Sequence, residues 1–352
     1  MSTTQGIDSA RVNRILVIKL RAIGDVLLST VVLSNLRAAF PAAQIDFLAE
    51  SPSRGILEGN PCLNNLIIFN GKKESGYSLI RRVRAGKYDL VIDLFGNPRS
   101  AVAALLSGAR YRLGFRLGWR EYCYNIVAEP RGGEVHNTEF NLDALRRINV
   151  PILSTVVNVP VDTTAERQAE EFFAAEGLNG KMVVALNPGG GWYTKRWLVS
   201  AYAELGDALR REYGVEILLT WGPGEESVID AIAKLMKEPS HRIPLVGLKA
   251  LAAMLSRCTL MVTNDSGPMH IAAAMGTPIV AIFGPTRPLL QGPFTEKRVI
   301  VQNTNIDCLG CNLTECPIGN PCMENLSADS VLAATRTLIK SLIPSPSMSP
   351  KQ

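Results

Sequence analysis

Short apolar runs alternate with helical patterns along most of this chain, and that alternation constrains its fold more than any other feature. In the first half the apolar runs lie at 15–20, 45–49, 66–69 and 90–94, with helical patterns at 25–39 and 77–85. Apolar runs of this kind, separated by helices, are typical of a parallel sheet that is covered on both faces. The sequence therefore predicts a doubly wound α/β fold.

The alternation lapses once, between residues 151 and 162, where extended sequence punctuated by proline replaces it. It restarts with a helical pattern at 163–176, and further apolar runs follow at 182–186, 216–220, 242–245, 260–263 and 278–283. A chain of 352 residues is long enough for two domains that each have a core. We expect two such domains facing a central cleft.

This restart sets the expected domain boundaries. The first domain spans 14–160 and the second spans 161–326, and a C-terminal helix at 327–342 is expected to pack back toward the first domain. Residues 1–13 and the tail 343–352, which is rich in proline and serine, are expected to be disordered.

Composition excludes several classes of protein. Hydrophobic residues make up 47% and charged residues 20%, which indicates a globular chain, and a net charge of +5 with no long basic run argues against nucleic-acid binding. The basic cluster 81–87 and the scattered arginines 110, 112, 116 and 120 suit a solvated surface, an anionic acceptor or a membrane surface. No apolar run reaches the roughly 18 residues of a membrane span, so we expect a cytoplasmic protein without a transmembrane segment.

The stretch 260–286 predicts an anion-binding turn. An apolar strand is followed by the polar turn 264–267, and a short helix then begins near Pro268 and ends before Gly276. Backbone N–H groups of the first helical turn, from Gly267 to His270, have no partner inside the helix. They would therefore face the carboxyl edge of the sheet, where phosphates and nucleotides bind.

Two further turns follow predicted strands in the second half. The first, 187–197, contains three consecutive glycines followed by Lys195 and Arg196, which suits a phosphate but lacks the ending of a Walker A loop. The second, 220–226, places Glu225 and Glu226 at the start of a helix. An acid there is either a helix cap or a ligand for ribose hydroxyls.

In the first half, Gly24 and Asp25 mark the turn from the first strand into the first long helix. Asp25 is either a cap at the helix N-terminus or a base at the edge of the sheet. His270 is more typical of a hydrogen-bonded structural histidine than of a catalytic one. The chain contains no Asp-x-Asp, so a carboxylate-held Mg²⁺ on a sugar diphosphate is not indicated, and we expect no catalytic metal.

Four motifs in this order resemble glycosyltransferase family 9, the ADP-heptose:lipopolysaccharide heptosyltransferases, and are most similar to the heptosyltransferase II type. They are ILVIKLRAIGDV at 15–26, NPGGG with KRW at 187–197, GPGE at 222–225, and NDSGPMH with FGPT at 264–286. The resemblance runs from about residue 14 to residue 342. It implies a GT-B fold of two Rossmann-like domains, with the acceptor on the first and the nucleotide sugar on the second, and an inverting, metal-independent transfer.

The resemblance also implies roles for individual residues. Asp25 would be the general base, Lys195 would bind the diphosphate, and Asp265 would contact the heptose. The backbone amides of Ser266 and Gly267 would hold phosphate, and Glu225 would bind the ribose. If the motif aligns one residue later, Glu226 would fill that role instead. Gly24 and His270 complete the expected substrate-binding set.

The implied reaction moves a heptose from ADP-L-glycero-D-manno-heptose to the inner core of lipopolysaccharide, at the cytoplasmic face of the inner membrane. We also considered another sugar-nucleotide enzyme on this fold, either with a different sugar donor or as an epimerase, and a non-catalytic glycan-binding protein. An epimerase needs no acceptor, and the presence of both Asp25 and Lys195 argues against a non-catalytic protein.

Cysteines cluster in one segment near the C-terminus: Cys308, Cys311, Cys316 and Cys322. The segment resembles a cysteine-rich stretch in a subset of the family. Its spacings are compatible with a structural zinc held by four thiolates but match no standard zinc or iron–sulfur pattern. Unligated thiols and redox-sensitive disulfides are the other interpretations.

Overall fold

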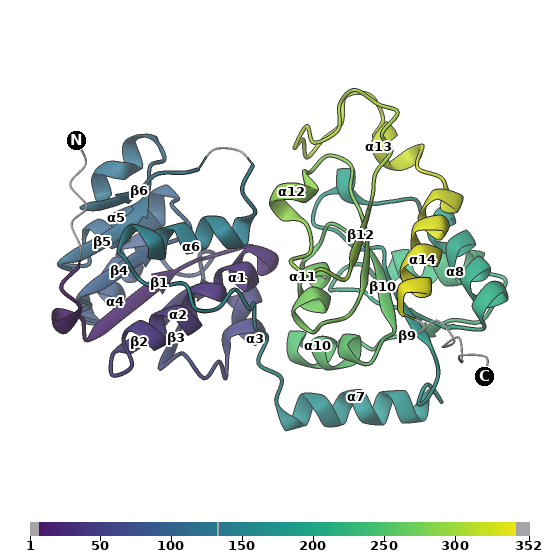
Figure 1. Cartoon of the computed structure of the whole chain (residues 1–352), viewed down its shortest axis with the longest axis horizontal. Coiled ribbons are helices and arrows are strands. Elements are labelled where there is room, and N and C mark those ends of the chain that lie inside the picture. The colour runs from purple at the N-terminus through teal and green to yellow at the C-terminus, as the bar shows by residue number, and fades with distance from the viewer. Residues whose placement is uncertain (1–6, 132–133, 343–352) are drawn as a thin grey trace, which may run out of the picture. The chain divides into compact units, whose positions relative to one another are not determined.

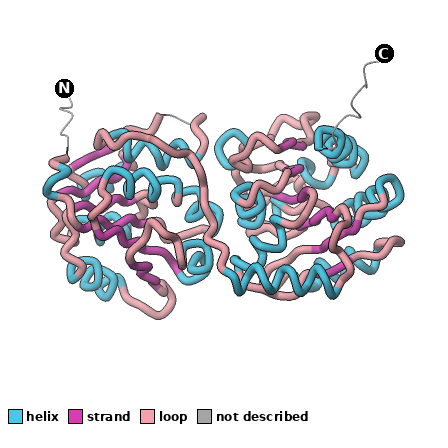
Figure 2. Tube along the Cα trace, turned by 60° about the horizontal axis from the view of Figure 1, so that its bottom comes forward, coloured by secondary structure: helices cyan, strands magenta, loops and turns pink. Residues whose placement is uncertain are grey.

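The structure, a computed structural model, describes residues 7–131 and 134–342. The chain divides into two compact units, Met1–Pro160 and Val161–Gln352, and each contains a six-stranded parallel sheet (Figure 1). Figure 2 shows the strands of each unit running through its interior, with helices and loops around them. The predicted doubly wound α/β fold is confirmed for both units.

In the first unit the strand order is β3-β2-β1-β4-β5-β6, with all neighbours parallel. The strands are β1 Arg14–Ile18, β2 Gln44–Glu50, β3 Asn65–Phe69, β4 Leu90–Asp93, β5 Tyr111–Phe115 and β6 Ile126–Ala128. The helices are α1 Ile23–Ser29, α2 Val31–Ala39, α3 Arg54–Leu57, α4 Gly76–Ala85, α5 Pro98–Leu105 and α6 Asn137–Arg147, with 3-10 turns η1 Ser9–Arg11, η2 Ser51–Ser53 and η3 Gly118–Cys123. The strand order reverses between β1 and β4, which places the switch point of a dinucleotide-type sheet there.

The second unit repeats this topology, with the order β12-β11-β10-β7-β8-β9. Its strands are β7 Val183–Asn187, β8 Glu216–Leu219, β9 His241–Arg242, β10 Leu260–Asn264, β11 Ile279–Ile282 and β12 Arg298–Val301. Its helices are α7 Thr163–Ala175, α8 Val199–Tyr213, α9 Glu226–Leu235, α10 Leu248–Ser256, α11 Gly267–Ala274, α12 Pro288–Gln291, α13 Pro321–Glu324 and α14 Ala328–Leu342, with η4 Tyr193–Lys195. Here the switch point lies between β7 and β10.

The central strands are buried along nearly their whole length, which explains their continuous apolar sequence. Every residue of β7 and β10 is buried, as are residues 15–18 of β1. A strand covered on both faces has no polar side, so it lacks the alternation of a half-exposed strand. Polar side chains therefore appear only where these strands end.

Different helices cover the two faces of the first sheet. Leu16 and Ile18 of β1 belong to a core that includes Leu79 and Val83 of α4, Ala101 of α5 and Cys123 of η3. Because side chains alternate along a strand, Ile15 and Val17 point to the opposite face. On that side α6 packs against α1 and α2.

The first predicted helix, 25–39, is divided into α1 and α2 at Thr30. The hydroxyl of Ser29 donates to the carbonyl of Val26, and that of Thr30 donates to Leu27, at 2.7 and 2.8 Å. Hydroxyls that bond back to the preceding turn bend helices, which explains the break. Strands β5 and β6 were not predicted, because Arg112 and Gly114 interrupt the apolar pattern of β5 and β6 has only three residues.

The ends of the chain also differ from expectation where they are described. Residues 7–13, expected to be disordered, include η1, where the Asp8 carboxylate accepts from the N–H of Ala10 and Val12 is buried. The other expected disordered residues, 1–6 and 343–352, lie outside the described part. Helix α14 packs on α8, β11 and β12 of the second unit. Its buried residues Val331, Leu338 and Ile339 join the apolar core of the second unit. That the helix also packs toward the first domain stays a prediction.

None of the helices within residues 7–131 and 134–342 has the length and apolar character that a bilayer span requires.

Candidate functional site

An ion pair joins two of the predicted residues at the carboxyl ends of the second sheet. The Nζ of Lys195 lies 2.7 Å from Oδ2 of Asp265, and the two side chains are 15% and 6% exposed. The Thr286 hydroxyl donates to the same carboxylate oxygen at 2.7 Å, and the Lys195 ammonium lies 4.4 Å from the centre of the Trp192 ring. A lysine charge is therefore held in place beside the turn that follows β10.

Helix α11 begins next to this ion pair. Ser266 is its N-cap residue, and the Asn187 side-chain amide donates to the Ser266 hydroxyl at 3.1 Å. Pro268 occupies the first turn, as predicted, and His270 is buried within the helix. The N–H groups at the start of α11 thus lie beside the lysine, which is the arrangement that binds phosphate at helix N-termini.

Asn264, the last residue of β10, holds the glycine-rich turn in place, and Asn187, the last residue of β7, donates to the Thr263 and Ser266 hydroxyls at the end of β10. The Asn264 amide donates to the carbonyls of Pro188 and Gly189 at 2.8 and 3.2 Å, and its oxygen accepts from the Tyr202 hydroxyl at 3.1 Å. Sequence reasoning assigned neither asparagine a role. A polar residue at the last position of an otherwise apolar strand is the signal that identifies them.

Glu225 connects the turn after β8 to the same glycine-rich turn. Its two carboxylate oxygens accept from the backbone N–H groups of Gly190 and Gly222, at 3.1 and 2.9 Å. The neighbouring Glu226 is exposed in the first turn of α9. The surroundings of the two acids therefore differ, and only Glu225 faces the residues at the strand ends.

Asp25 lies in the first unit, in the first turn of α1, where it is half-buried beside the buried Gly24. One carboxylate oxygen accepts from the N–H of Ala22 at 3.3 Å, and the other lies 3.5 Å from the side-chain nitrogen of Asn137, at the start of α6. Asp25 therefore caps its helix. These two contacts leave lone pairs of both oxygens available for another donor.

A half-buried lysine near Asp25 was not indicated by the sequence. The Lys19 ammonium donates to the carbonyl of Leu94 at 2.9 Å. Burial lowers the pKa of Lys19, and the nearby carboxylates of Asp25 and Asp93 oppose that shift. Asp93 accepts from the Tyr124 hydroxyl at 2.7 Å, and burial raises its pKa. The sequence feature that could have indicated Lys19 is its position at the end of an apolar strand.

The interpretation of the cysteine segment as a zinc site is not supported. Among the described residues, no group of three or more His, Cys, Asp or Glu side chains is arranged to hold a metal ion. All four thiols are free, and they lie at different depths, since Cys322 is buried in the core of the second unit while Cys311 is exposed. Burial raises the pKa of the Cys322 thiol to about 11.

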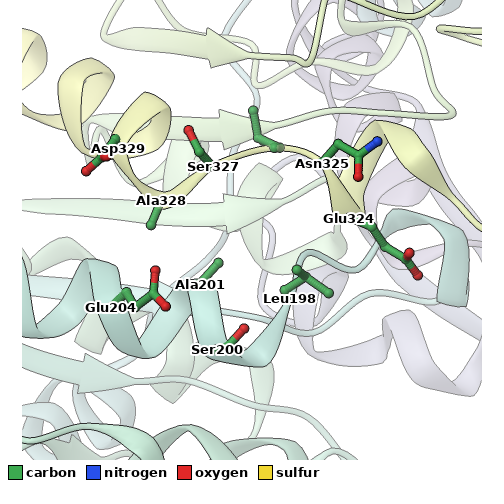
Figure 3. Close-up of a pocket in the computed structure, with 10 residues that line it drawn as sticks. Leu198, Ser200, Ala201, Glu204, Glu324, Asn325, Ser327, Ala328 and Asp329 are labelled. Atoms are coloured by element: carbon green, nitrogen blue, oxygen red, sulfur yellow. The ribbon is translucent and has the colours of Figure 1, made fainter.

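A separate pocket of about 380 Å³ lies between the start of α8 and the segment that joins α13 to α14 (Figure 3). Three carboxylates line it, those of Glu204, Glu324 and Asp329, and none of the predicted site residues does. Negative charge at this position would repel a diphosphate. The pocket is therefore unsuited to the anionic donor, unlike the strand ends that carry Lys195.

Two parallel sheets of the same topology, with polar turns at the ends of their strands, form a fold of the GT-B type, and solved structures of this fold class match. A glycosyltransferase family 9 structure from Veillonella parvula superposes with a TM-score of 0.82 and 26% identity, covering 94% of this chain and 97% of that one. A structure of E. coli ADP-heptose lps heptosyltransferase II gives 0.75 and 22%, covering 93% and 99%.

The sequence matches the model of Glycosyltransferase family 9 (heptosyltransferase) over residues 76–321, more than half of its length, and the chain belongs to that family. Lipopolysaccharide heptosyltransferase 3 of Escherichia coli K12 is 28% identical over 342 residues, which cover 92% of this chain and 97% of the relative. The resemblance drawn from the four sequence motifs is thereby confirmed, and the protein is a glycosyltransferase.

Proposed function

We propose that this protein transfers a heptose from ADP-L-glycero-D-manno-heptose to the inner core of lipopolysaccharide, with inversion and without a catalytic metal. The Lys195–Asp265 ion pair beside the start of α11 carries the proposal, because it joins a cation, a carboxylate and helical N–H groups at one sheet edge. The names of the relatives support it, since they describe lipopolysaccharide and ADP-heptose enzymes.

The second unit would bind the donor. Lys195 would bind the diphosphate together with the backbone amides of Ser266 and Gly267. Asp265 would contact the heptose once Lys195 turns to the diphosphate, because its carboxylate then loses one partner and keeps the hydrogen bond from Thr286. Glu225 would accept from the ribose hydroxyls while its bonds to the two glycine turns hold it in place. His270, buried in α11, would support that helix start.

The first unit would supply the base. Asp25 would accept the proton of the acceptor hydroxyl, whose oxygen forms a bond to the anomeric carbon as the bond from that carbon to the diphosphate breaks. ADP leaves with the electron pair of that bond, and the attack from the opposite face inverts the anomeric centre. Gly24, beside Asp25, has no side chain to obstruct the acceptor. A positioned base of this kind accelerates a reaction by about 10²–10⁴-fold.

Charge on the departing diphosphate would be stabilised by Lys195 and the N–H groups of α11. Once the donor is bound, both would be in position before the reaction, which would make them effective because they need no reorganisation as the charge develops. The chain has no Asp-x-Asp to bind a divalent cation. We further propose that the enzyme works at the cytoplasmic face of the inner membrane, where a lipid-anchored acceptor would be available.

The proposal is tested by incubating the protein with ADP-heptose and a heptose-deficient lipopolysaccharide acceptor while ADP release and product mass are followed. We expect ADP release only when acceptor is present, and a product heavier by one heptose, in the presence of a chelator as well as without it. Conversion of the sugar nucleotide without acceptor would indicate an epimerase. Binding without any turnover would indicate a glycan-binding protein.

A further inference from the structure

One surface of the first unit combines exposed aromatic and basic side chains. It is formed by α4, α5 and η3, and α5 packs against both of the others. We call it the α4–α5–η3 surface. The large apolar side chains of this layer that are exposed include Tyr77, Leu105, Leu106, Trp119 and Tyr122.

The exposure of these residues is unusual for their size. Trp119 is 58% exposed and Tyr122 is 82% exposed, both on η3, and Tyr77 on α4 is 75% exposed. Leu105 and Leu106 end α5 with 41% and 42% exposure. Single exposed apolar residues need no explanation, but a group on adjacent elements indicates a binding surface.

Helical spacing separates this surface from the core. In α4, Leu79 and Val83 are buried against the sheet, whereas Tyr77, Arg81 and Arg84 recur at helical intervals on the other side. The Arg84 guanidinium donates to the carbonyl of Leu106 at 3.3 Å, which places basic and apolar side chains of neighbouring helices together. The amphipathic pattern therefore continues from α4 onto α5.

The charged side chains of this segment are mostly basic. Between residues 76 and 123 the acids are Asp89, Asp93 and Glu121. Asp89 and Asp93 do not contribute to the surface, while Glu121 lies on η3, where it pairs with Arg116. Asp93 is buried, and Asp89 accepts from the N–H groups of Asn13 and Arg14. Within the described residues, Arg82 and Arg116 have carboxylate partners, while Arg81, Arg84, Lys87, Arg99 and Arg110 have no salt bridge.

We infer that the α4–α5–η3 surface binds the headgroup region of an anionic lipid bilayer. Tryptophan and tyrosine favour the boundary between headgroups and acyl chains, because their rings are apolar while their N–H or O–H groups remain hydrated. Arginine and lysine beside them are attracted to negatively charged lipids. This charge complementarity distinguishes a membrane from a second copy of this basic chain. The inference deepens the proposed function and rests on it for a lipid-anchored acceptor.

The test measures sedimentation of the full-length protein with vesicles of phosphatidylcholine that contain or lack phosphatidylglycerol, with no donor or acceptor present. Wild type should bind the anionic vesicles, and Arg81→Gln/Arg84→Gln should bind about thirtyfold more weakly. Trp119→Ser/Tyr122→Ser should bind at least about tenfold more weakly. Matched controls come from exposed residues of the second unit, Arg211→Gln/Lys234→Gln and Leu235→Ser/Leu245→Ser, and should bind like wild type.

Absence of wild-type binding to anionic vesicles, or equal losses in the controls, would overturn the inference. The inference would also be overturned if Trp119 and Tyr122 were needed for self-association of the protein but not for vesicle binding. Transfer to a water-soluble acceptor fragment is measured in parallel with the same variants, and we expect it to persist. If neither wild type nor any variant transfers sugar, but vesicle binding follows the pattern above, the proposed function is wrong and the inference of a membrane-binding surface is supported.

Discussion

The Asp25 carboxylate accepts from the N–H of Ala22 and lies 3.5 Å from the Asn137 amide, so it has a structural role whatever else it does. A cap at a helix N-terminus contributes about 1 kcal/mol. Asparagine keeps an oxygen that can accept the N–H of Ala22 but cannot take a proton from an acceptor hydroxyl. Substitution by asparagine therefore separates the capping role from the proposed catalytic one.

For Asp25→Asn we expect turnover to fall by about 10²–10⁴-fold with ADP affinity within a factor of about two of wild type, because the loss is confined to the reaction step. Steady-state ADP release and calorimetric ADP binding measure the two quantities. Asp329→Asn, which changes an exposed acid in the first turn of α14, is the matched control and should retain wild-type turnover. Near-normal turnover in Asp25→Asn would exclude Asp25 as the base.

At the scale of elements, the turns after β7 and β8 are held together by one side chain. A Cβ added at Gly189 would come within 2.4 Å of a Glu225 carboxylate oxygen, and each oxygen of that carboxylate accepts from one backbone N–H group. Gly191, two residues later in the same turn, has no atom within 4 Å of the equivalent position. Of these two glycines, Gly191 therefore has room for a Cβ atom and Gly189 does not.

Gly189→Ala should displace the Glu225 carboxylate and weaken ADP binding by about tenfold or more, since a hydrogen bond to a charged group contributes about 1.5–3 kcal/mol. Gly191→Ala keeps Glu225 in place and should reduce ADP affinity less. Calorimetric titration with ADP ranks the two variants, and thermal unfolding shows that both remain folded. An equal or larger loss in Gly191→Ala would show that Glu225 is not what the first substitution disturbs.

The amino end of β8, at the opposite edge of the sheet from the proposed donor site, contains an ion cluster around Glu216. Lys181 donates to Glu216 at 2.9 Å, and Arg210 and His241 also contact its carboxylate. His241 in turn lies 2.7 Å from Glu176, just after α7. Hydrogen bonds, that of Lys181 foremost, lower the pKa of Glu216 from 4.5 to about 2.

A carboxyl whose pKa is lowered in the folded state adds stability above the unfolded pKa, and that stability is lost as the pH falls toward the folded pKa. Glu216→Gln should therefore lower the free energy of unfolding by up to about 3 kcal/mol near pH 7, and the difference from wild type should shrink between about pH 4.5 and about 2. Urea unfolding across this range measures it. Asp230→Asn, which breaks an exposed ion pair with Arg242, should change stability by less than about 1 kcal/mol. A difference that does not depend on pH would contradict the assignment to this charge.

At the scale of the whole molecule, two units of the same topology have different polar residues at their strand ends. Lys195, Asp265 and Glu225 belong to the second unit and Asp25 to the first. Donor binding and proton removal are thus proposed for different units of one chain, which a binding experiment without acceptor can separate.

Saturating ADP should slow amide hydrogen exchange most in the second unit, in the turns at 187–196, 220–226 and 264–270. A ligand that binds only the folded state, at about 100 times its dissociation constant, stabilises that state by about 2.7 kcal/mol. Exchange measured by mass spectrometry with and without ADP maps the effect. Adenosine alone lacks the diphosphate, so it should protect the turns after β7 and β10 less than ADP does. Strongest protection within residues 7–131 would place the nucleotide on the first unit instead.

The sequence alone determined the parallel sheets, the start of α11 and the positions of Gly24, Asp25, Lys195 and Asp265 in turns after strands. These features depend on apolar periodicity and on glycine, proline and capping residues, which act over a few neighbouring residues. Strands β5 and β6 lacked such local signals. The tertiary structure decided which strand ends are neighbours and so which distant side chains meet.

Strand order across a sheet is a property of packing, not of chain order. Only the pairing of β7 with β10 brings Lys195 to Asp265 and Asn264 to the glycine-rich turn. Burial likewise separated Cys322 from the exposed Cys311, although their spacing in sequence allowed a common metal. The depth of a side chain and its position across the sheet are set when whole elements pack, so neither can be inferred from a short stretch of sequence.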